Sequence, residues 1–340
     1  MTAILYGKEN WITDRLVSEY FSHNPSTTVD FFAAVQAAKE HLSNGPEAMV
    51  RRFVAISGGT IWLPMPWVLQ GATIGPLLGP ILEACNLTVT IHHIVPEKFF
   101  NEESKIEVFT KLEPFVNTYH VTNEKTKEVL QQVTDKEITV LPFWSNPDVW
   151  HPIQDRATLK EELKISKDKF TIGSFQRDTE GNDKKSPKLE KGPDRLCDIV
   201  ENLYRTGVEG KEVQLILAGY NRQYVINRLR KTCSNLEVLY FERIPSQYLN
   251  RLYNCLDLYI VSSRIEGGPQ ALVEASLARC PIVSTDVGLA KTILPPESIY
   301  NDANDFHLAT PNVEVAYRNA LKLAPHPGLF EKYKKMFAAT

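Results

Sequence analysis

Two glutamates, two glycines and a proline lie together between apolar runs in the second half of the chain. The segment Leu258–Leu289 reads LYIVSSRIEGGPQALVEASLARCPIVSTDVGL, so an apolar strand ends in two serines shortly before Glu266. Gly267 and Gly268 follow, and we expect Pro269 to be the first residue of a helix, because its missing N–H costs nothing there. The pattern predicts a strand, a tight loop and a helix that begins beside the two glycines.

This loop and helix could bind a molecule that carries both phosphate and hydroxyl groups. Backbone N–H groups at Gly268 and Gln270 would form a helix N-terminus, which attracts phosphate, and glycines let a ligand approach the backbone closely. Glu266 in the loop and Glu274 in the second helical turn place two carboxylates beside that anion site. Carboxylates suit sugar hydroxyls better than phosphate. The alternative interpretation of the two carboxylates is a solvated helix face.

Apolar runs and helical stretches alternate along the whole chain, which is typical of βα units with parallel strands. A proline-rich segment without periodicity, residues 141–152, predicts a linker between two such series. A polar insertion over residues 178–190 is expected to be a mobile loop at the end of a strand. In the first series we expect strands at Ala3–Tyr6, Phe53–Ser57, Leu87–Ile91, Thr118–Val121 and Ile138–Leu141, and helices at Trp11–Phe21 and Thr27–Leu42. In the second we expect strands at Phe170–Ser174, Val213–Ala218, Leu236–Phe241, Leu258–Ser262 and Ile282–Ser284, and helices at Asp194–Tyr204, Arg222–Lys231, Ser246–Cys255, Pro269–Ala278 and Leu329–Phe337.

The motif around the two glutamates resembles that of the retaining family-4 glycosyltransferases of the GT-B fold. Seven residues separate Glu266 from Glu274, Gly-Gly-Pro lies between them and an alanine follows the second. The resemblance is specific over about Val213–Leu294 and weaker elsewhere. It implies an α/β chain with two Rossmann-like, doubly wound domains facing a cleft. We expect an acceptor-side domain over 1–150, a nucleotide-sugar donor domain over 151–325, and a helix over 326–340 that could cross back to the first domain.

The same resemblance implies two cations for the donor diphosphate. Gly173, at the end of a strand, is followed by Arg177, and Lys191 precedes the Gly-Pro pair that starts the next helix. In the family these cations hold the diphosphate and stabilise it as it leaves. The insertion between them keeps three other lysines, Lys184, Lys185 and Lys188, open as alternatives to Arg177.

Further positions follow from the resemblance. Gly219 corresponds to the glycine that ends the family's second strand, and Arg243 and Ile244 lie in the expected base-contacting loop. In the first domain, His92 corresponds to a strand-end histidine that faces the donor sugar. The loop Gly7–Trp11 has one glycine where the family has a glycine-rich loop.

The resemblance implies a retaining enzyme of the hexosyltransferase type that moves a sugar from a UDP-, GDP- or ADP-sugar to a hydroxyl acceptor, in glycan or glycoconjugate synthesis. Arg177, Lys191 and the helix N-terminus would stabilise charge on the leaving diphosphate, Glu266 would bind the donor sugar and Glu274 the ribose. No Asp-x-Asp occurs in the chain, so we expect metal-independent transfer without a cofactor. A non-catalytic sugar-nucleotide-binding subunit, and a GT-B epimerase or hydrolase, are the alternatives.

The composition and charge of the chain limit the kinds of molecule that it is expected to bind. The chain has 340 residues, 43% of them hydrophobic, and a formal net charge of −3, which favours neither a nucleic-acid binder nor a disordered chain. Residues 1–150 carry 11 Lys and Arg against 17 Asp and Glu, and an acidic surface repels DNA and anionic lipids. Five widely spaced cysteines indicate a reducing compartment, and no signal peptide is visible. We expect a cytoplasmic protein without a transmembrane segment, for which peripheral membrane contact and oligomeric state stay open.

Overall fold

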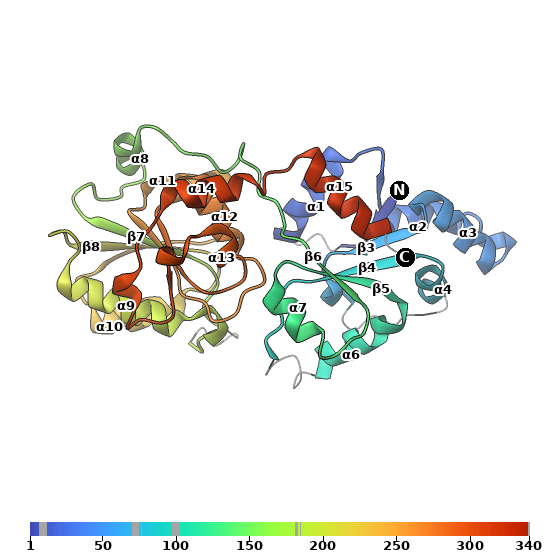
Figure 1. The fold of residues 1–340 in the computed structure, drawn as a ribbon, viewed down its shortest axis with the longest axis horizontal. Coiled ribbons are helices and arrows are strands. Elements are labelled where there is room, and N and C mark those ends of the chain that lie inside the picture. The colour runs from blue at the N-terminus through green and yellow to red at the C-terminus, as the bar shows by residue number, and fades with distance from the viewer. Residues whose placement is uncertain are drawn as a thin grey trace. The chain divides into compact units, whose positions relative to one another are not determined.

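The computed structural model describes residues 1–6, 12–69, 75, 77–96, 103–180, 183 and 185–338. The chain forms two compact units (Figure 1). Unit 1 comprises Met1–Trp144 together with Pro325–Thr340, and unit 2 comprises Ser145–Ala324. Each unit has one parallel sheet with helices on both faces, which confirms the predicted pair of doubly wound α/β domains.

The sheet of unit 1 has the strand order β2-β1-β3-β4-β5-β6, and every strand pairs in parallel with its neighbours. Its central strands are almost fully buried, as expected for a parallel sheet covered on both faces. The strands are β1 (Thr2–Ile4), β2 (Thr28–Asp30), β3 (Thr60–Leu63), β4 (Asn86–Ile91), β5 (Val116–Val121) and β6 (Glu137–Val140).

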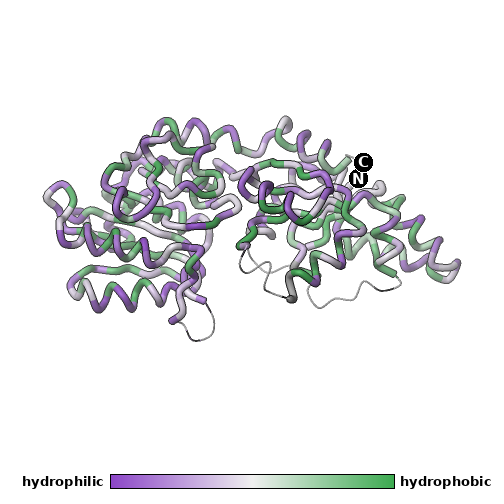
Figure 2. The backbone as a smooth tube through the Cα atoms, turned by 60° about the horizontal axis from the view of Figure 1, so that its bottom comes forward, coloured by the Kyte–Doolittle hydropathy of each residue, from purple (hydrophilic) through white to green (hydrophobic). Residues whose placement is uncertain are grey.

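Two apolar clusters cover the two faces of this sheet. One is formed with α2, α3, α4, α6 and α7, and the other with α1 and the C-terminal helix α15. Along the helices, hydrophobic and hydrophilic stretches alternate, as amphipathic helices require (Figure 2). The helices are α1 (Ile12–His23), α2 (Phe31–Lys39), α3 (Pro46–Ser57), α4 (Leu78–Glu83), α6 (Glu103–Leu112), α7 (Glu124–Leu130) and α15 (Pro327–Ala338), with 3₁₀ turns at Leu42–Asn44, Pro66–Leu69 and Glu113–Phe115.

Two predicted elements of unit 1 are wrong. Phe53–Ser57, expected to be a strand, is the end of α3, whose buried Met49, Phe53 and Ser57 recur every four residues on one helical face. The left-handed Gly58 ends this helix, and the strand follows at Thr60–Leu63. Thr27–Leu42 is not one helix, because Thr28–Asp30 pairs with β1 before Asp30 caps α2.

Unit 2 has the strand order β12-β11-β10-β7-β8-β9, again parallel throughout. In chain order its strands therefore lie as 3-2-1-4-5-6, and the order reverses between β7 and β10. The strands are β7 (Phe170–Phe175), β8 (Val213–Ala218), β9 (Glu237–Phe241), β10 (Leu258–Val261), β11 (Ile282–Thr285) and β12 (Ile299–Tyr300).

One face of this sheet packs against α8, α11, α12, α13 and α14, and the opposite face packs against α9 and α10. Figure 1 shows these two layers on either side of β7 and β8. The helices are α8 (Arg156–Glu162), α9 (Pro193–Thr206), α10 (Gln223–Thr232), α11 (Ser246–Cys255), α12 (Gln270–Leu277), α13 (Ala290–Ile293) and α14 (Val313–Leu321), with 3₁₀ turns at Leu189–Lys191, Pro296–Ser298 and Phe306–Leu308.

The chain enters and leaves unit 2 at neighbouring points. The backbone N–H of Ser145, the first residue of the unit, donates to the carbonyl of Leu323 at 3.0 Å. The Ser145 hydroxyl donates to Oε1 of Gln270, the first residue of α12, at 2.7 Å.

The polar insertion after β7, expected to be a mobile loop, begins in the interior of unit 2, whereas Asp183, Lys185, Ser186 and Leu189 are exposed. Asp178 and Thr179 are completely buried, and Thr179 forms an antiparallel bridge with Pro187. Within the part of the chain that the structure describes, no helix is long and apolar enough to cross a membrane.

Candidate active site

The reversal of strand order in unit 2 places the ends of β7 and β10 side by side. In open α/β sheets, ligands bind at the carboxyl ends of the strands at such a point. Lys191 lies beyond β7, just before α9, and Glu266 lies beyond β10, just before α12. Lys191 and Glu266, which the sequence analysis expects in a donor site, therefore both lie at this edge of the sheet.

Lys191 and Glu266 form a short ion pair. Lys191 Nζ donates to Glu266 Oε2 at 2.6 Å, with side-chain exposures of 16% and 11%. The Ser263 hydroxyl donates to the other carboxylate oxygen at 2.8 Å. A cation, a carboxylate and a hydroxyl thus converge at the carboxyl end of the sheet, where a phosphate and a sugar hydroxyl could each find a partner.

Close backbone packing brings the two loops together. Gly192 has φ +59°, and a Cβ on it would lie 1.9 Å from the carbonyl oxygen of Ser262. The N–H groups of Arg264 and Ile265 both donate to the carbonyl of Glu190, at 2.8 and 3.1 Å. A side chain at position 192 would push the segment after β7 away from the segment after β10. The Lys191–Glu266 contact therefore depends on glycine at this position.

The glycine loop leads into α12, as predicted, but the helix begins at Gln270. Pro269 is its N-cap, with ψ 104°, so the expectation that Pro269 is the first helical residue is wrong by one position. No side chain caps this N-terminus, which is the arrangement that binds anions. Gly288, with φ +50°, packs against the loop, and a Cβ there would lie 2.9 Å from the carbonyl of Gly267.

Glu274 is on the second turn of α12 and is 5% exposed. The buried hydroxyl of Tyr253 donates to its Oε2 at 3.3 Å. Burial raises the pKa of Tyr253 well above its usual range, so this hydroxyl stays a donor. Glu274 is therefore held as an acceptor and is not on the solvated helix face that was the alternative.

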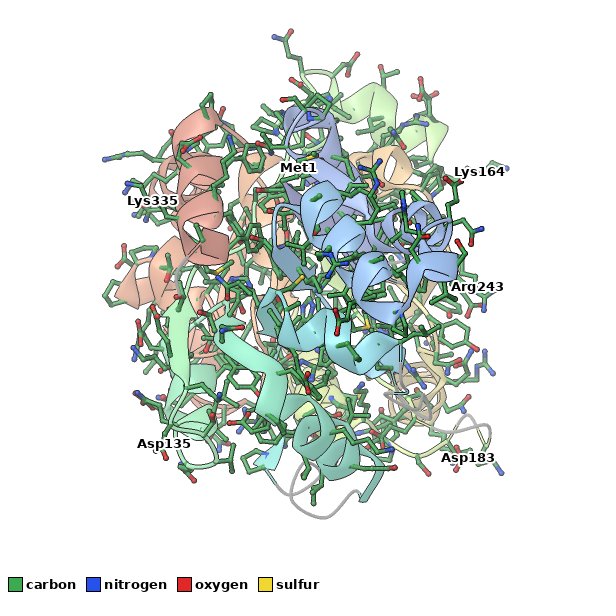
Figure 3. The ribbon with its side chains drawn as sticks, turned by 90° about the vertical axis from the view of Figure 1, so that its right-hand side faces the viewer. Met1, Asp135, Lys164, Asp183, Arg243 and Lys335 are labelled. Atoms are coloured by element: carbon green, nitrogen blue, oxygen red, sulfur yellow. The ribbon has the colours of Figure 1, made fainter. Side chains whose placement is uncertain are left out.

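Arg177 and Arg243 meet on one aromatic ring. The two guanidinium carbons lie 5.6 and 4.9 Å from the ring centroid of Tyr220, within the range of a cation–π contact. The three residues follow β7, β8 and β9, at the same edge of the sheet as Lys191. Both arginines are exposed, and Arg243 is labelled in Figure 3. Ile244 is half-buried and packs on the core.

Two predicted donor-binding glycines have packing partners. A Cβ on Gly173 would lie 2.2 Å from Leu256 Cδ1, and one on Gly219 would lie 2.7 Å from the carbonyl of Gln176. Gly219 also has φ +110°. Gly219 requires glycine for the chain to pack, whereas a side chain at Gly173 would displace Leu256. Whether either contacts a donor stays a prediction.

His92 is in unit 1, at the carboxyl end of β4. Its Nε2–H donates to the carbonyl of Pro64 at 2.8 Å, and its ring packs on Phe143. Burial lowers the pKa of His92 below its ordinary value, so the ring is neutral at pH 7 and its Nδ1 carries a lone pair.

A second, unpredicted histidine lies nearby. Trp62 Nε1–H donates to Thr90 Oγ1 at 2.9 Å, Thr90 donates to His120 Nδ1 at 2.9 Å, and His120 Nε2–H donates to the carbonyl of Leu141 at 2.7 Å. An indole only donates and a carbonyl only accepts, so the chain runs in one direction when Thr90 donates to Nδ1 of a neutral His120. Burial lowers the pKa of His120 to about 4.

Several predicted residues are not part of these contacts. Lys188 pairs with Glu190 at 3.7 Å. Lys185 is exposed. The loop Gly7–Trp11 and Lys184 lie outside the described residues. Among the residues that are described, no group of three or more His, Cys, Asp or Glu is placed to hold a metal ion.

Sequence reasoning missed the residues that hold the site together. Ser263 binds Glu266, and the Gln176 side-chain amide donates to the carbonyl of Lys191 at 2.9 Å. Arg222, predicted only as the start of a helix, is a fully buried cation paired with Asp178, the residue after Arg177. The available signal for Arg222 was a charged residue shortly after an apolar strand. Its partner Asp178 is 44 positions away in the sequence, so no local pattern indicates the pair.

Part of the chain matches a known protein family. Residues 185–336 match the model of the family described as glycosyl transferases group 1. That segment contains Lys191, Glu266 and Glu274. No curated protein sequence is significantly similar to the chain.

Solved structures resemble the whole chain at low sequence identity. Sucrose-phosphate synthase from Thermosynechococcus elongatus has a TM-score of 0.67 at 15% identity, over 100% of this chain and 99% of that one. Anabaena HepE in complex with UDP-glucose has a TM-score of 0.72 at 15% identity, with the same coverage. A glycosyltransferase from Rickettsia africae ESF-5 has a TM-score of 0.64 at 12% identity, over 99% of this chain and 97% of that one.

The fold of the chain is therefore GT-B, as predicted. Residues 185–336 therefore resemble glycosyl transferases of group 1, and the solved structures share the fold of the chain.

Proposed function

We propose that the chain is a retaining, metal-independent glycosyltransferase of family 4 that transfers a hexosyl group from a nucleotide sugar to a hydroxyl acceptor. The observation that carries this proposal is the cluster of Lys191, Glu266 and Ser263 beside an uncapped helix N-terminus at the switch point of unit 2. These groups match the needs of a sugar diphosphate, and they lie in the segment that the family model matches. UDP is the first nucleotide to test, because the HepE structure contains UDP-glucose.

Each side chain then has a role in transfer. Arg177, Lys191 and the first N–H groups of α12 stabilise the negative charge that builds on the departing diphosphate. Glu274, held by Tyr253, accepts hydrogen bonds from the ribose, and Glu266 accepts them from the donor sugar. His92 is proposed to donate or accept a hydrogen bond at the donor sugar as a neutral imidazole.

Retention follows if the acceptor enters on the face from which the diphosphate leaves. A phosphate oxygen of the leaving group takes the acceptor proton, and the cations balance its charge, so neither a covalent nucleophile nor a metal is required. The absence of any Asp-x-Asp in the sequence and the presence of these cations support metal independence.

Calorimetric titration with UDP, GDP and ADP in EDTA tests the donor site. One nucleotide should bind, and Glu274→Ala should weaken that binding tenfold or more. Transfer is then followed with the matching sugar nucleotide, and the NMR coupling constant of the product's anomeric proton reports retention or inversion. Full loss of turnover in EDTA, restored by manganese, would refute metal independence.

The two alternatives give different results in the same assay. Release of free sugar without an acceptor would indicate an epimerase or hydrolase. Binding without turnover over a broad panel of acceptors would indicate a sugar-nucleotide-binding subunit, and no binding of any nucleotide would refute the proposal.

A further inference from the structure

A buried ion pair involves Asp178, the residue that follows Arg177, one of the proposed diphosphate ligands. Arg222 Nε donates to Asp178 Oδ2, and both side chains are 0% exposed. Among the described residues, every other ion pair keeps part of at least one side chain exposed. Removing two charges from water costs roughly what their attraction returns, so this pair is better explained by the geometry it imposes than by stability.

The guanidinium of Arg222 joins the ends of two strands. Besides Asp178 it donates to the carbonyls of Ser174 in β7 and Ala218 in β8, the latter at 3.0 Å, and to Ser174 Oγ at 3.3 Å. Arg222 is also the N-cap residue of α10. Only the planar fork of an arginine offers donors in these directions at once.

Arg177 is the exposed residue between two fixed points of this network. On its N-terminal side, the N–H of Gln176 donates to the carbonyl of Ala218 at 3.0 Å. On its C-terminal side, the N–H groups of Asp178 and Thr179 donate to the carbonyl of Asn221 at 3.3 and 3.1 Å. The Arg177 side chain itself donates from Nε to the Thr179 carbonyl at 3.2 Å.

The same network closes the insertion that separates the two proposed diphosphate cations. The N–H of Lys188 donates to the carbonyl of Asp178 at 2.8 Å, and the N–H of Lys191 donates to the carbonyl of Lys188 at 2.8 Å. Asp178 is therefore adjacent to Arg177 in the chain and is connected to Lys191 through the backbone of Lys188, although the insertion separates the two cations in sequence.

We propose that Asp178 and Arg222 are positioning residues for the donor diphosphate, which they serve by fixing Arg177 at the end of β7 and holding the insertion closed toward Lys191. The proposal rests on the function proposed above. It is specific to the phosphate part of the ligand, because the network does not include Glu274, the proposed ribose ligand.

The test compares a nucleoside with its diphosphate. Binding of uridine is measured by NMR titration and binding of UDP by calorimetry, for the wild type and for Asp178→Asn. We expect the variant to bind UDP at least tenfold more weakly and uridine within twofold of the wild type. In an Arg177→Ala background, Asp178→Asn should weaken UDP binding by less than a further twofold. The effects of two substitutions are not additive when one residue acts through the other.

The matched control is Asp257→Asn. Asp257 accepts from Lys160 and Arg156 just before β10, at the opposite edge of the same sheet. Asp257→Asn should lower the melting temperature of the protein without changing the ratio of UDP affinity to uridine affinity. Thr179→Val is a second variant that keeps the side chain's shape and both charges, and it removes the 2.9 Å bonds from Thr179 Oγ1 to Asp178 Oδ1 and from the Tyr224 N–H to Thr179 Oγ1. We expect it to weaken UDP binding about threefold.

Unchanged UDP affinity in these variants, or an equal loss of UDP and uridine, would overturn the positioning role while leaving the proposed function intact. A wild type that binds none of UDP, GDP and ADP would overturn both.

Discussion

Replacing Glu266 by glutamine should make the protein bind UDP more tightly and transfer sugar more slowly. Lys191 is paired with Glu266 at 2.6 Å, and 16% and 11% of the two side chains are exposed. A diphosphate that recruits Lys191 must compete with this carboxylate. Glutamine has the same shape and still accepts from Ser263, but it carries no charge.

The size of the effect follows from the geometry. Two unit charges about 4 Å apart attract by roughly 4 kcal/mol at an effective dielectric constant of about 20. Most of this attraction is offset by the desolvation of the two charges and by the contact that the glutamine amide would still make with Lys191. The net contribution of a hydrogen bond to a charged group is about 1.5–3 kcal/mol. Taking the lower end, we expect UDP to bind about tenfold more tightly to Glu266→Gln. Removal of a negative charge beside a diphosphate acts in the same direction.

Calorimetry at low and high salt measures this directly. The gain in UDP affinity should shrink as salt screens the charges, and uridine affinity should be unchanged. The transfer rate should fall, because the proposed donor-sugar ligand is lost.

Weaker UDP binding by Glu266→Gln, with an unchanged melting temperature, would refute the reasoning. It would mean that Glu266 binds the nucleotide itself and that Lys191 is not sequestered.

Three further predictions concern other parts of the chain. Glu274→Ala should weaken UDP and uridine together by tenfold or more, and unchanged calorimetric affinities would assign Glu274 a purely structural role. The buried His120, whose pKa is lowered from 6.5 to about 4, binds a proton more readily when the chain unfolds. The free energy of unfolding should therefore fall by roughly 3 kcal/mol as the pH drops from about 6.5 to 4. Denaturant titrations should show that slope reduced in His120→Gln and kept in His307→Gln, since His307 is exposed. Gly192→Ala should lower the free energy of unfolding by about 3 kcal/mol or more, whereas Gly210→Ala, at φ +75° with no atom within 4 Å of the new Cβ, should cost about 1 kcal/mol.

Much of unit 2 could be predicted because its signals are local. Each strand of its sheet except the short β12 is an apolar run bounded by turn residues, and the expected bounds agree with the structure to within one or two residues. The loop from Glu266 to Gln270 was found for the same reason, since its glycines and proline are adjacent in sequence.

The errors arise where contacts distant in sequence decide the structure. Phe53–Ser57 is apolar enough for a strand, but its pattern continues back to Met49 and Pro46 and belongs to a helix. Asp178 and Thr179 have the polar character of surface residues, but they are buried, and Asp178 pairs with Arg222, 44 positions away. The Lys191–Glu266 contact joins residues 75 positions apart, and no local pattern indicates a charge partner at that separation.

The hydrogen bond from Ser145 to Leu323 has a consequence for how the chain folds. It joins the two points at which the polypeptide enters and leaves unit 2, so that unit is an insertion of 180 residues whose ends are adjacent. Closing a disordered segment of that length costs about 4 kcal/mol more than closing a loop of two residues. Once unit 2 has folded, that entropy has already been lost, and α15 can reach unit 1 as if it followed Trp144 across a short turn. The C-terminal helix should therefore dock late, after the domain inserted before it is complete.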